Sequence, residues 1–388
     1  MSRDWLYLDY AATTPVDACV AEVMQRYLTY ADEFGNPSAQ HAAGRAAMQA
    51  VDEAAESLAA LVNCDPGRLV WTSGATESNN LAIQGIARSR AQEGRHLVTM
   101  PTEHKAVTDV FRALEKQGFE VTWLRPGRDG RLNLAELEAA IRDDTQLVSI
   151  MCVNNETGVV QDIAAIGKLC ADRGVVFHVD AAQAVGKLAL DISALDVDLV
   201  SMTAHKLYGP KGIGALYVRK RAGVNPEPLF FGGAQQGFLR PGTLPVHLIA
   251  GFGAAAAIAG ESILDDFTHL KLLNERLWHG IESLPGIVRN GDAETSYPGI
   301  LNVSAGGIDG ESLLLALEPL CVSTGSACNS QSQEPSAVLR AMGLSDALAE
   351  SAIRFSFGRP TTVADIDRAI DIYRAAVIRL RGLLPEAA

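Results

Sequence analysis

The sequence is poor in cysteine, in aromatic residues and in basic charge. Its six cysteines are scattered over 388 residues, and no two have the short spacing of a zinc or redox motif. We therefore expect no metal site, and we expect free thiols in a reducing, cytoplasmic compartment. The net charge of −13 argues against direct binding of a nucleic acid, whose backbone is itself negatively charged.

The sequence also lacks a hydrophobic leader and a long uninterrupted apolar run. Its first ten residues, MSRDWLYLDY, carry no apolar signal segment. We find no run long enough to cross a bilayer and expect no membrane partner. Hydrophobic residues make up 48% of the chain and charged residues 20%, which is typical of a globular protein. The length allows a large core and favours two structural units.

Seven short apolar runs end in polar or glycine-rich turns. Most are apolar on both faces, which is typical of strands buried between two layers of helices. They lie at residues 69–73, 96–100, 120–125, 147–154, 175–181, 198–203 and 214–219. Helical patterns separate many of them, for example at 134–141 and 163–173. The alternation predicts an α/β domain around a mainly parallel, seven-stranded sheet.

The pattern changes after about residue 260. A long helical stretch at 261–284 is followed by three short apolar runs, at residues 300–304, 321–323 and 353–357. The chain closes with an amphipathic helix, and Thr362 and Asp365 have the spacing of a capping box at its start. We predict a large domain over residues 15–260 and a smaller α+β domain formed by residues 1–14 together with 261–388.

Polar residues follow five of the predicted strands, at the edge where open α/β sheets bind their ligands. Residues 73–78 follow the first of these strands and open a helix. Gly74 allows close approach of the backbone, and free N–H groups at a helix start attract a phosphate. A plain capped helix start is the simpler explanation of this turn taken alone.

An acid and a lysine end two further strands. Asp180 closes an apolar strand, and a buried carboxylate needs a partner, either an internal salt bridge or a protonated pyridine nitrogen. Lys206 is either a surface lysine or an amine that forms a Schiff base because burial or nearby charge lowers its pKa. The apolar strand before Lys206 favours the second interpretation.

A histidine and an amide-rich turn follow the remaining two strands. His104 could stack on a flat ring or move protons, and residues 154–158 offer amide hydrogen bonds. Each is more often structural when it stands alone. Together with the phosphate-type turn, the acid and the lysine, they predict a binding site for pyridoxal phosphate. The cofactor would supply the electron sink, and the protein its position and electrostatics.

Two residues of the C-terminal part could act on a substrate. Arg354 alternates with Ile353 and Phe355 on a short strand. It either lies on an exposed strand face or grips a carboxylate with two parallel hydrogen bonds. Cys328 lies in a small polar segment, where a thiol is accessible and either reactive or accidental. About ten extended residues span roughly 30 Å, enough to carry an atom from a deep site to the surface.

With these motifs in view, the chain resembles the cysteine desulfurases of the NifS/IscS group over nearly its whole length. The motifs are residues 7–15, 34–38, 72–78, 102–106, 153–156, 178–181, 205–212, 240–247 and 325–328. The resemblance implies the aspartate-aminotransferase fold (fold type I), a homodimer with sites near the subunit interface, and pyridoxal 5'-phosphate as cofactor. It also implies conversion of L-cysteine to L-alanine, with sulfur passing to a protein cysteine.

The resemblance further implies a role for each site residue. Lys206 would bind the cofactor covalently, and Asp180 would pair with its ring nitrogen. His104 would stack on the ring and take part in catalysis, and Gln183 would contact the phenolic oxygen. Asn155 and Arg354 would hold the substrate, Asn155 also contacting the cofactor, and Cys328 would be the nucleophile. The phosphate would be held by Ala75, Thr76, Thr203 and His205, with Thr243 reaching the partner subunit's phosphate.

The chain departs from its relatives at three places. Thr203 and Ala204 stand where many relatives have serine and glycine; the hydroxyl is kept, so we expect phosphate binding to persist. Gln236 stands where a glutamate is usual. The chain stops at residues 384–388, where housekeeping relatives continue into a tail that helps to dock the iron–sulfur scaffold protein. We therefore expect that docking tail to be absent. Iron–sulfur assembly, tRNA thiolation and DNA phosphorothioation remain open as destinations of the sulfur.

Three alternatives remain. An aminotransferase of the same fold would explain Lys206, Asp180 and Arg354 but gives Cys328 no task. A non-catalytic subunit could use the fold for binding alone, although the intact set of lysine, aspartate and histidine argues against it. Selenocysteine cleavage shares the chemistry, and the cysteine-bearing loop favours cysteine as the main substrate.

Overall fold

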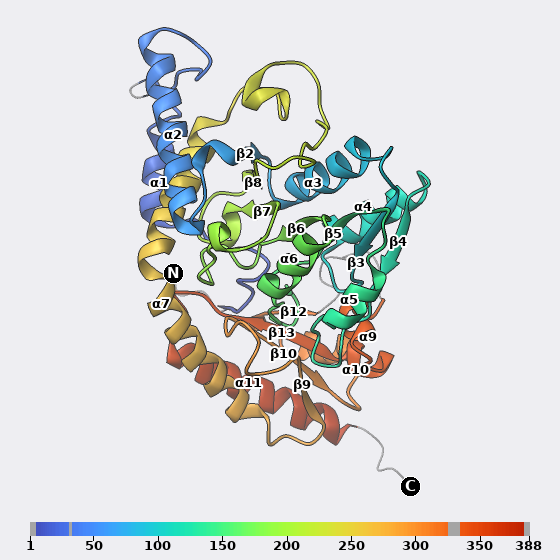
Figure 1. Ribbon diagram of the computed structural model, residues 1–388. Coiled ribbons are helices and arrows are strands. Elements are labelled where there is room, and N and C mark those ends of the chain that lie inside the picture. The colour runs from blue at the N-terminus through green and yellow to red at the C-terminus, as the bar shows by residue number, and fades with distance from the viewer. Residues whose placement is uncertain (1–4, 31–32, 325–333, 384–388) are drawn as a thin grey trace.

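A seven-stranded sheet forms the centre of the larger part of the molecule (Figure 1). The computed structural model describes residues 5–30, 33–324 and 334–383. The strand order is β2-β8-β7-β6-β5-β3-β4, and β8 runs antiparallel to both of its neighbours while the other pairings are parallel. The predicted mainly parallel sheet is confirmed.

The strands lie where the apolar runs predicted them. They are β2 (Leu69–Thr72), β3 (His96–Thr99), β4 (Glu120–Trp123), β5 (Thr145–Ser149), β6 (Val176–Asp180), β7 (Leu199–Thr203) and β8 (Gly214–Val218). The largest difference is at β5, which ends at Ser149 rather than at residue 154. Beyond Ser149 the Met151 N–H is bound by the Glu103 carboxylate at 2.8 Å, while the N–H groups of Ile150 and Cys152 still donate to carbonyls of β6.

Both faces of the sheet are buried, and neighbouring residues of one strand belong to different cores. Leu147 packs in a core with α3 (Ala75–Ser89) and α4 (Lys105–Glu115), whereas Val148 packs with α2 (Ala42–Val62) and α6 (Ile163–Asp172). This explains why the strand sequences are apolar without alternation. Shorter helices complete the layers: α1 (Ala18–Gln25), α5 (Leu134–Ala140), η1 (Pro66–Arg68) and η2 (Ile192–Ala194).

The helix α7 (Val246–Ile281) runs along both parts of the molecule (Figure 1). It begins 15 residues before the predicted start at residue 261. Its glycines Gly251 and Gly253 lie against α1 and α2, and Gly280 lies against Ile370 of α11 (Val363–Gly382). By length and composition α7 could cross a membrane, so the expectation that no apolar run is long enough was wrong. Half of its most apolar window is buried, because helices pack against it on several sides.

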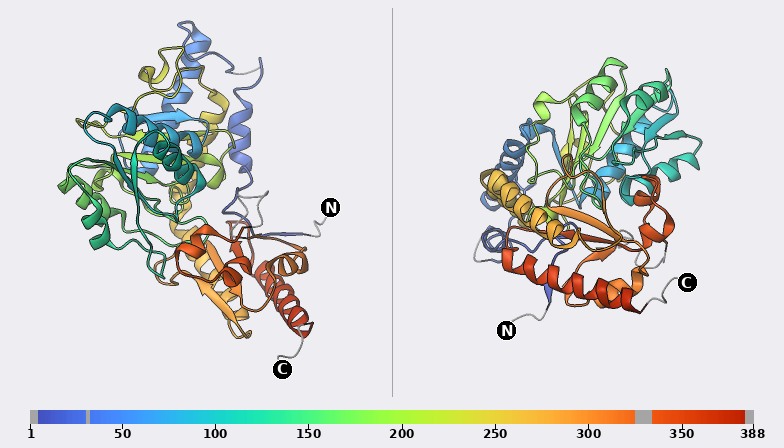
Figure 2. Two further views of the ribbon diagram at one scale, coloured as in Figure 1. Left: turned by 90° about the vertical axis from the view of Figure 1, so that its right-hand side faces the viewer. Right: turned by 90° about the horizontal axis from the view of Figure 1, so that it is seen from below.

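The C-terminal part is a four-stranded antiparallel sheet covered by helices. Its order is β12 (Ser323–Thr324), β13 (Ala352–Ser356), β10 (Ile300–Ala305) and β9 (Ile287–Asn290). Figure 2 shows α11 beside the second half of α7. The predicted capping box is confirmed, since Thr362 and Asp365 exchange hydrogen bonds at the start of α11. The remaining helices here are α8 (Gly310–Ala316), α9 (Ala337–Ala341) and α10 (Asp346–Glu350).

The N-terminal residues join this C-terminal part. The strand β1 (Leu6–Tyr7) pairs in parallel with β11 (Leu320–Cys321), and the Ser356 N–H donates to the Leu8 carbonyl at 2.8 Å. The division into 15–260 and 1–14 with 261–388 stays a prediction, and α7 passes through its boundary without a break.

The edge strand β2 is covered by a side chain. Gln236, in η4 (Gln235–Phe238), accepts from the Trp71 N–H at 2.5 Å and donates to the Trp71 carbonyl at 2.9 Å. Its amide therefore pairs with the strand as a further peptide group would.

Candidate active site

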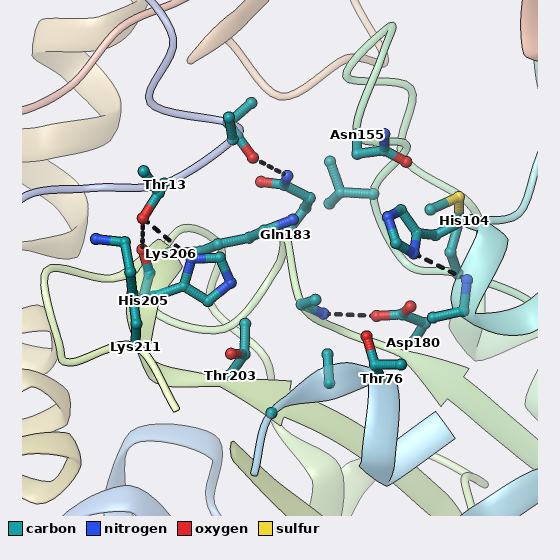
Figure 3. A pocket seen from close by; sticks show the side chains of 18 of the residues that line it. Thr13, Thr76, His104, Asn155, Asp180, Gln183, Thr203, His205, Lys206 and Lys211 are labelled. Carbon is teal, nitrogen blue, oxygen red and sulfur yellow. Dashed lines mark hydrogen bonds between the residues drawn. The ribbon is translucent and has the colours of Figure 1, made fainter. Parts of the chain in front are cut away.

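The carboxyl ends of β2, β6 and β7 open into a cavity of about 640 Å³. That volume lies in the range of small-molecule sites, about 300–1,000 Å³. Ten of the predicted site residues line it: Ala75, Thr76, His104, Asn155, Asp180, Gln183, Thr203, His205, Lys206 and Arg354. Figure 3 shows His104 and Asp180 on one side, His205 and Thr13 on the other, and Lys206 and Gln183 between them.

One end of the cavity, here called the amide cradle, is formed by residues 73–76 together with Thr203 and His205. Gly74 takes a φ of +150°, which other residues rarely adopt, and lets the chain turn from β2 directly into α3. Gly74 is the N-cap of α3, and no side chain among the described residues caps the helix, so N–H groups of the first turn are available to a ligand. This geometry suits an anion.

His205 adds a neutral donor to the amide cradle. Burial, reinforced by the nearby charge of Lys206, lowers the pKa of His205 to about 4, so the imidazole is uncharged at neutral pH. Its Nδ1 lies 3.1 Å from the Thr13 hydroxyl. The amide cradle thus offers hydrogen bonds rather than full positive charges, except from Lys211, which also lines the cavity.

Asp180 lies at the end of β6 and is 4% exposed. Its Oδ2 accepts from the Asn79 side chain at 2.7 Å, and its Oδ1 accepts from the Ala182 N–H at 2.9 Å. Both donors are neutral, and neither balances the charge of a buried carboxylate. The site therefore suits a cationic group of a ligand.

His104 and Lys206 face the same cavity from different strands. Lys206 ends the short helix η3 (Ala204–Lys206) directly after β7. His104 is the N-cap of α4, and its Nδ1 accepts from the Ala106 N–H at 3.1 Å. The proton of the neutral imidazole therefore lies on Nε2. Burial and the charge of Lys206 lower the pKa of His104, which favours this neutral form.

The opposite end of the cavity, here called the charged wall, consists of Arg354 and Asp9 with the neighbouring Asn155. The Arg354 guanidinium donates to Asp9 Oδ1 at 2.7 Å and to the Asn155 carbonyl at 2.8 Å. Arg354 is 5% exposed, which rules out the exposed strand face that the sequence left open. Within the described part of the chain, Arg354 Nε and Asn155 Oδ1 are buried without a hydrogen-bond partner. Each therefore needs a ligand group or a bound water as its partner.

Of the predicted site residues that the structure describes, Thr243 alone lies outside this cavity. Thr243 is exposed in the segment between η4 and α7 and does not line it. Cys328 lies outside the described residues. The described chain on either side of its segment borders the site: Ser323 lines the main cavity, and Glu334 lines a neighbouring one together with His104 and Asn155.

Sequence reasoning gave no role to two residues of this site. Asp9 lies in the motif 7–15, but nothing in the sequence indicates that it pairs with Arg354, which is 345 residues away. Lys187 follows Gln183 by four residues, and its Nζ donates to Gln183 Oε1 at 2.5 Å. A lysine four residues after a glutamine is a weak sequence signal, because it is common on exposed helices.

A mainly parallel sheet with a lysine, an aspartate and an anion-type helix start at its strand ends defines an α/β enzyme of fold type I. The family model of class-V aminotransferases matches residues 6–369. Cysteine desulfurase IscS of Vibrio cholerae serotype O1 is 56% identical over 381 residues, which cover 98% of this chain and 94% of that protein.

Solved structures agree with these matches. A NifS-like protein superposes with a TM-score of 0.89 at 34% identity, covering 96% of this chain and 100% of that one. The structure of SspA in complex with cysteine superposes with a TM-score of 0.82 at 38% identity, covering 92% and 100%. The chain belongs to the class-V aminotransferase family and, within it, to the cysteine desulfurases of the NifS/IscS group.

Proposed function

We propose that the chain is a pyridoxal-phosphate-dependent cysteine desulfurase that turns L-cysteine into L-alanine and keeps the sulfur as a persulfide on Cys328. The observation that carries the proposal is the meeting of Lys206, Asp180 and the amide cradle in one cavity. The phosphate fits the uncapped start of α3, and the pyridine nitrogen fits the Asp180 carboxylate, whose hydrogen-bond donors are neutral.

The remaining cofactor contacts follow from this placement. Lys206 would hold the cofactor covalently through Nζ, His104 would stack on the ring, and Gln183 would reach the phenolic oxygen. Ala75, Thr76, Thr203 and His205 would bind the phosphate. When bound, pyridoxal phosphate supplies the electron sink for charge that develops at the substrate Cα.

The protein's own residues would perform the other steps. Arg354 would bind the substrate carboxylate, using the Nε donor that has no partner among the described residues, and Asn155 would orient the substrate. Lys206, displaced by the substrate amine, would take the Cα proton at Nζ. His104 would contact the substrate thiol through its Nε2–H, since its Nδ1 already accepts from the Ala106 N–H.

The Cys328 thiolate would then attack the substrate sulfur. The new S–S bond forms as the substrate C–S bond breaks, and the electron pair of the C–S bond stays on carbon. Protonation of that carbon releases alanine, so one thiol and one cysteine become one persulfide and one alanine. A sulfur acceptor then takes the outer sulfur for iron–sulfur cluster assembly or for another sulfur-containing product.

We also propose a cytoplasmic homodimer. Thr243 is exposed in the single chain, and it follows a segment with exposed aromatic side chains at Phe230, Phe231 and Phe238. Exposed apolar side chains gathered on one segment are typical of an interface. Light scattering tests this directly, since a mass of one chain at micromolar concentration contradicts the dimer.

Cys328→Ser tests the proposed function. We expect this variant to bind the cofactor and to change its visible spectrum with L-cysteine, but to form no persulfide and little alanine. The matched control is Cys321→Ser, which removes a neighbouring thiol of raised pKa and should leave alanine formation unchanged. Wild-type rates of alanine release from Cys328→Ser would contradict the proposal. Release of a keto acid by the wild type would favour an aminotransferase instead.

A further inference from the structure

Lys187 is a half-buried lysine that the proposed mechanism does not use. It borders a small cavity of about 30 Å³, room for about one water molecule, and Lys206 lines the same cavity. Burial lowers the pKa of Lys187 well below its ordinary range, and the charges of Lys206 and Arg354 lower that pKa further. Placing a lysine in such surroundings costs desolvation free energy, which indicates that the side chain has a function.

The nearest polar contact of Lys187 is the side chain of Gln183. Lys187 Nζ donates to Gln183 Oε1 at 2.5 Å, and Gln183 Nε2 donates to the Ala11 carbonyl at 2.8 Å. Lys187 Nζ also lies 5.6 Å from the centre of the Tyr297 ring. The amino group is thus held between an amide oxygen and an aromatic face.

These two partners fix which way the Gln183 amide points. A carbonyl oxygen can only accept, so Ala11 requires Nε2 on its side whatever the charge of Lys187. The oxygen Oε1 must then face Lys187, which donates in both its charged and its neutral form. One N–H of Nε2 remains, and Gln183 projects into the main cavity between Lys206 and Asn155 (Figure 3).

We propose that Lys187 is a positioning residue, which holds Gln183 so that an N–H rather than a carbonyl oxygen faces the phenolic oxygen of bound pyridoxal phosphate. This inference rests on the proposed function. Lys187, together with the Ala11 carbonyl, would thereby keep a donor rather than an acceptor at the phenolic oxygen, whose charge governs how easily the bound cofactor loses its proton.

The pH at which the bound cofactor changes colour tests this. A donor stabilises negative charge on the phenolic oxygen and lowers that pH. We expect Lys187→Met to raise the midpoint by about half to one pH unit, the size of one neutral hydrogen bond. Other titratable or charged side chains also border the small cavity, and they must stay unchanged in the comparison. They are Tyr10, Lys206, Tyr208, Asp266, Tyr297 and Arg359.

A double-mutant cycle separates positioning from a direct effect of charge. In a Gln183→Met background, Lys187→Met should shift the midpoint little further, because the amide it positions is gone. An equal shift in both backgrounds would overturn the inference, since Lys187 would then act by its own charge. Lys187→Arg keeps a donor, and the adjoining cavity leaves room for the larger group, so this variant should restore the wild-type midpoint if the inference holds.

Affinity gives a second readout that does not depend on turnover. Fluorescence titration of cofactor-free protein with pyridoxal phosphate should show weaker binding for Lys187→Met than for wild type, and normal binding for Lys187→Arg. Normal binding and a normal midpoint in Lys187→Met would overturn the inference while leaving the proposed function intact. A wild-type protein that binds no pyridoxal phosphate would instead overturn the proposed function, and the inference with it.

Discussion

The amide cradle and the charged wall face the same cavity but consist of different kinds of chemical group. The amide cradle uses backbone N–H groups, a hydroxyl and a neutral imidazole, and none of these carries a charge that must be desolvated. The charged wall buries Arg354 against Asp9. Removing one of these partners leaves the charge of the other buried and uncompensated. We therefore expect single substitutions to have larger effects near buried charges than in the amide cradle.

The largest effect is expected at Lys206. Lys206→Ala should abolish covalent attachment of the cofactor, because it removes the amine that follows β7, at the end of η3, and lines the cavity. Borohydride reduction followed by intact-mass measurement checks this. Lys211→Ala is the matched control, since Lys211 lines the same cavity and should leave the adduct in place. A reduced adduct on Lys206→Ala would move the attachment to another lysine.

Arg354 should come next. Arg354→Ala is expected to weaken L-cysteine binding by about 2–5 kcal/mol, or at least about thirtyfold, because it removes a charge-assisted carboxylate contact. Arg354→Lys should recover only part of this, since an ammonium cannot bind a carboxylate with two parallel bonds.

A second variant shows whether the loss belongs to the substrate or to the ion pair. Asp9→Asn removes the partner charge but keeps the guanidinium in the cavity, and it should retain most of the affinity. The cofactor's spectral response to L-cysteine measures all three variants. Equal losses of L-cysteine affinity in Asp9→Asn and Arg354→Ala would mean that the affinity depends on the ion pair and not on a contact with the substrate.

Glu156 should make stability depend on pH. Burial raises its pKa to about 7, although it accepts from the Ser336 hydroxyl and lies near Arg354. The folded state thus binds a proton that the unfolded state releases near pH 4.5, so stability falls as pH rises from about 4.5 to about 7. The loss is about 3 kcal/mol, and Glu156→Gln should remove it.

Urea denaturation of wild type and Glu156→Gln at pH 5 and at pH 8 checks the sign. The variant should gain stability relative to wild type at the higher pH. A difference between the two proteins that is the same at both pH values would show that Glu156 is ionised throughout.

The smallest effect should come from the amide cradle. Thr203→Val is expected to weaken cofactor binding by about 1 kcal/mol, roughly fivefold, which is the size of one neutral hydrogen bond. Thr203→Ser keeps the hydroxyl and should bind as wild type does. Equilibrium titration of the cofactor-free proteins measures both. A loss as large as that of Arg354→Ala would remove the distinction between the two ends of the cavity.

Much of this site could be predicted from the sequence because its residues follow strands. Asp180 and Lys206 each end an apolar run, and parallel strands bring their carboxyl ends to one edge. The Asp9–Arg354 pair could not be predicted, because contacts between the two ends of a chain leave no local pattern. Arg354 was ambiguous for the same reason: only β12 and β10 on either side of β13 show that its polar face meets the cavity.

The start of α7 was missed for a different reason. Residues 246–260 are rich in alanine and glycine, and small residues on all sides give no amphipathic pattern. They are needed because neighbouring helices approach closely: a side-chain carbon on Gly253 would lie 2.5 Å from the Ala54 backbone. Such packing depends on the residues of the partner helix, so it could not be predicted from the sequence of α7 alone.

The amide of Gln236 has a consequence for how the folded protein behaves in a crowded solution. An uncovered edge strand is a template onto which another extended chain can add. Gln236 satisfies both the N–H and the carbonyl of Trp71 on the outer side of β2, so an approaching strand finds no free pair there. A glutamate at this position could accept from the N–H but, when ionised, could not donate to the carbonyl. We therefore expect the glutamine to hinder the addition of another strand at Trp71.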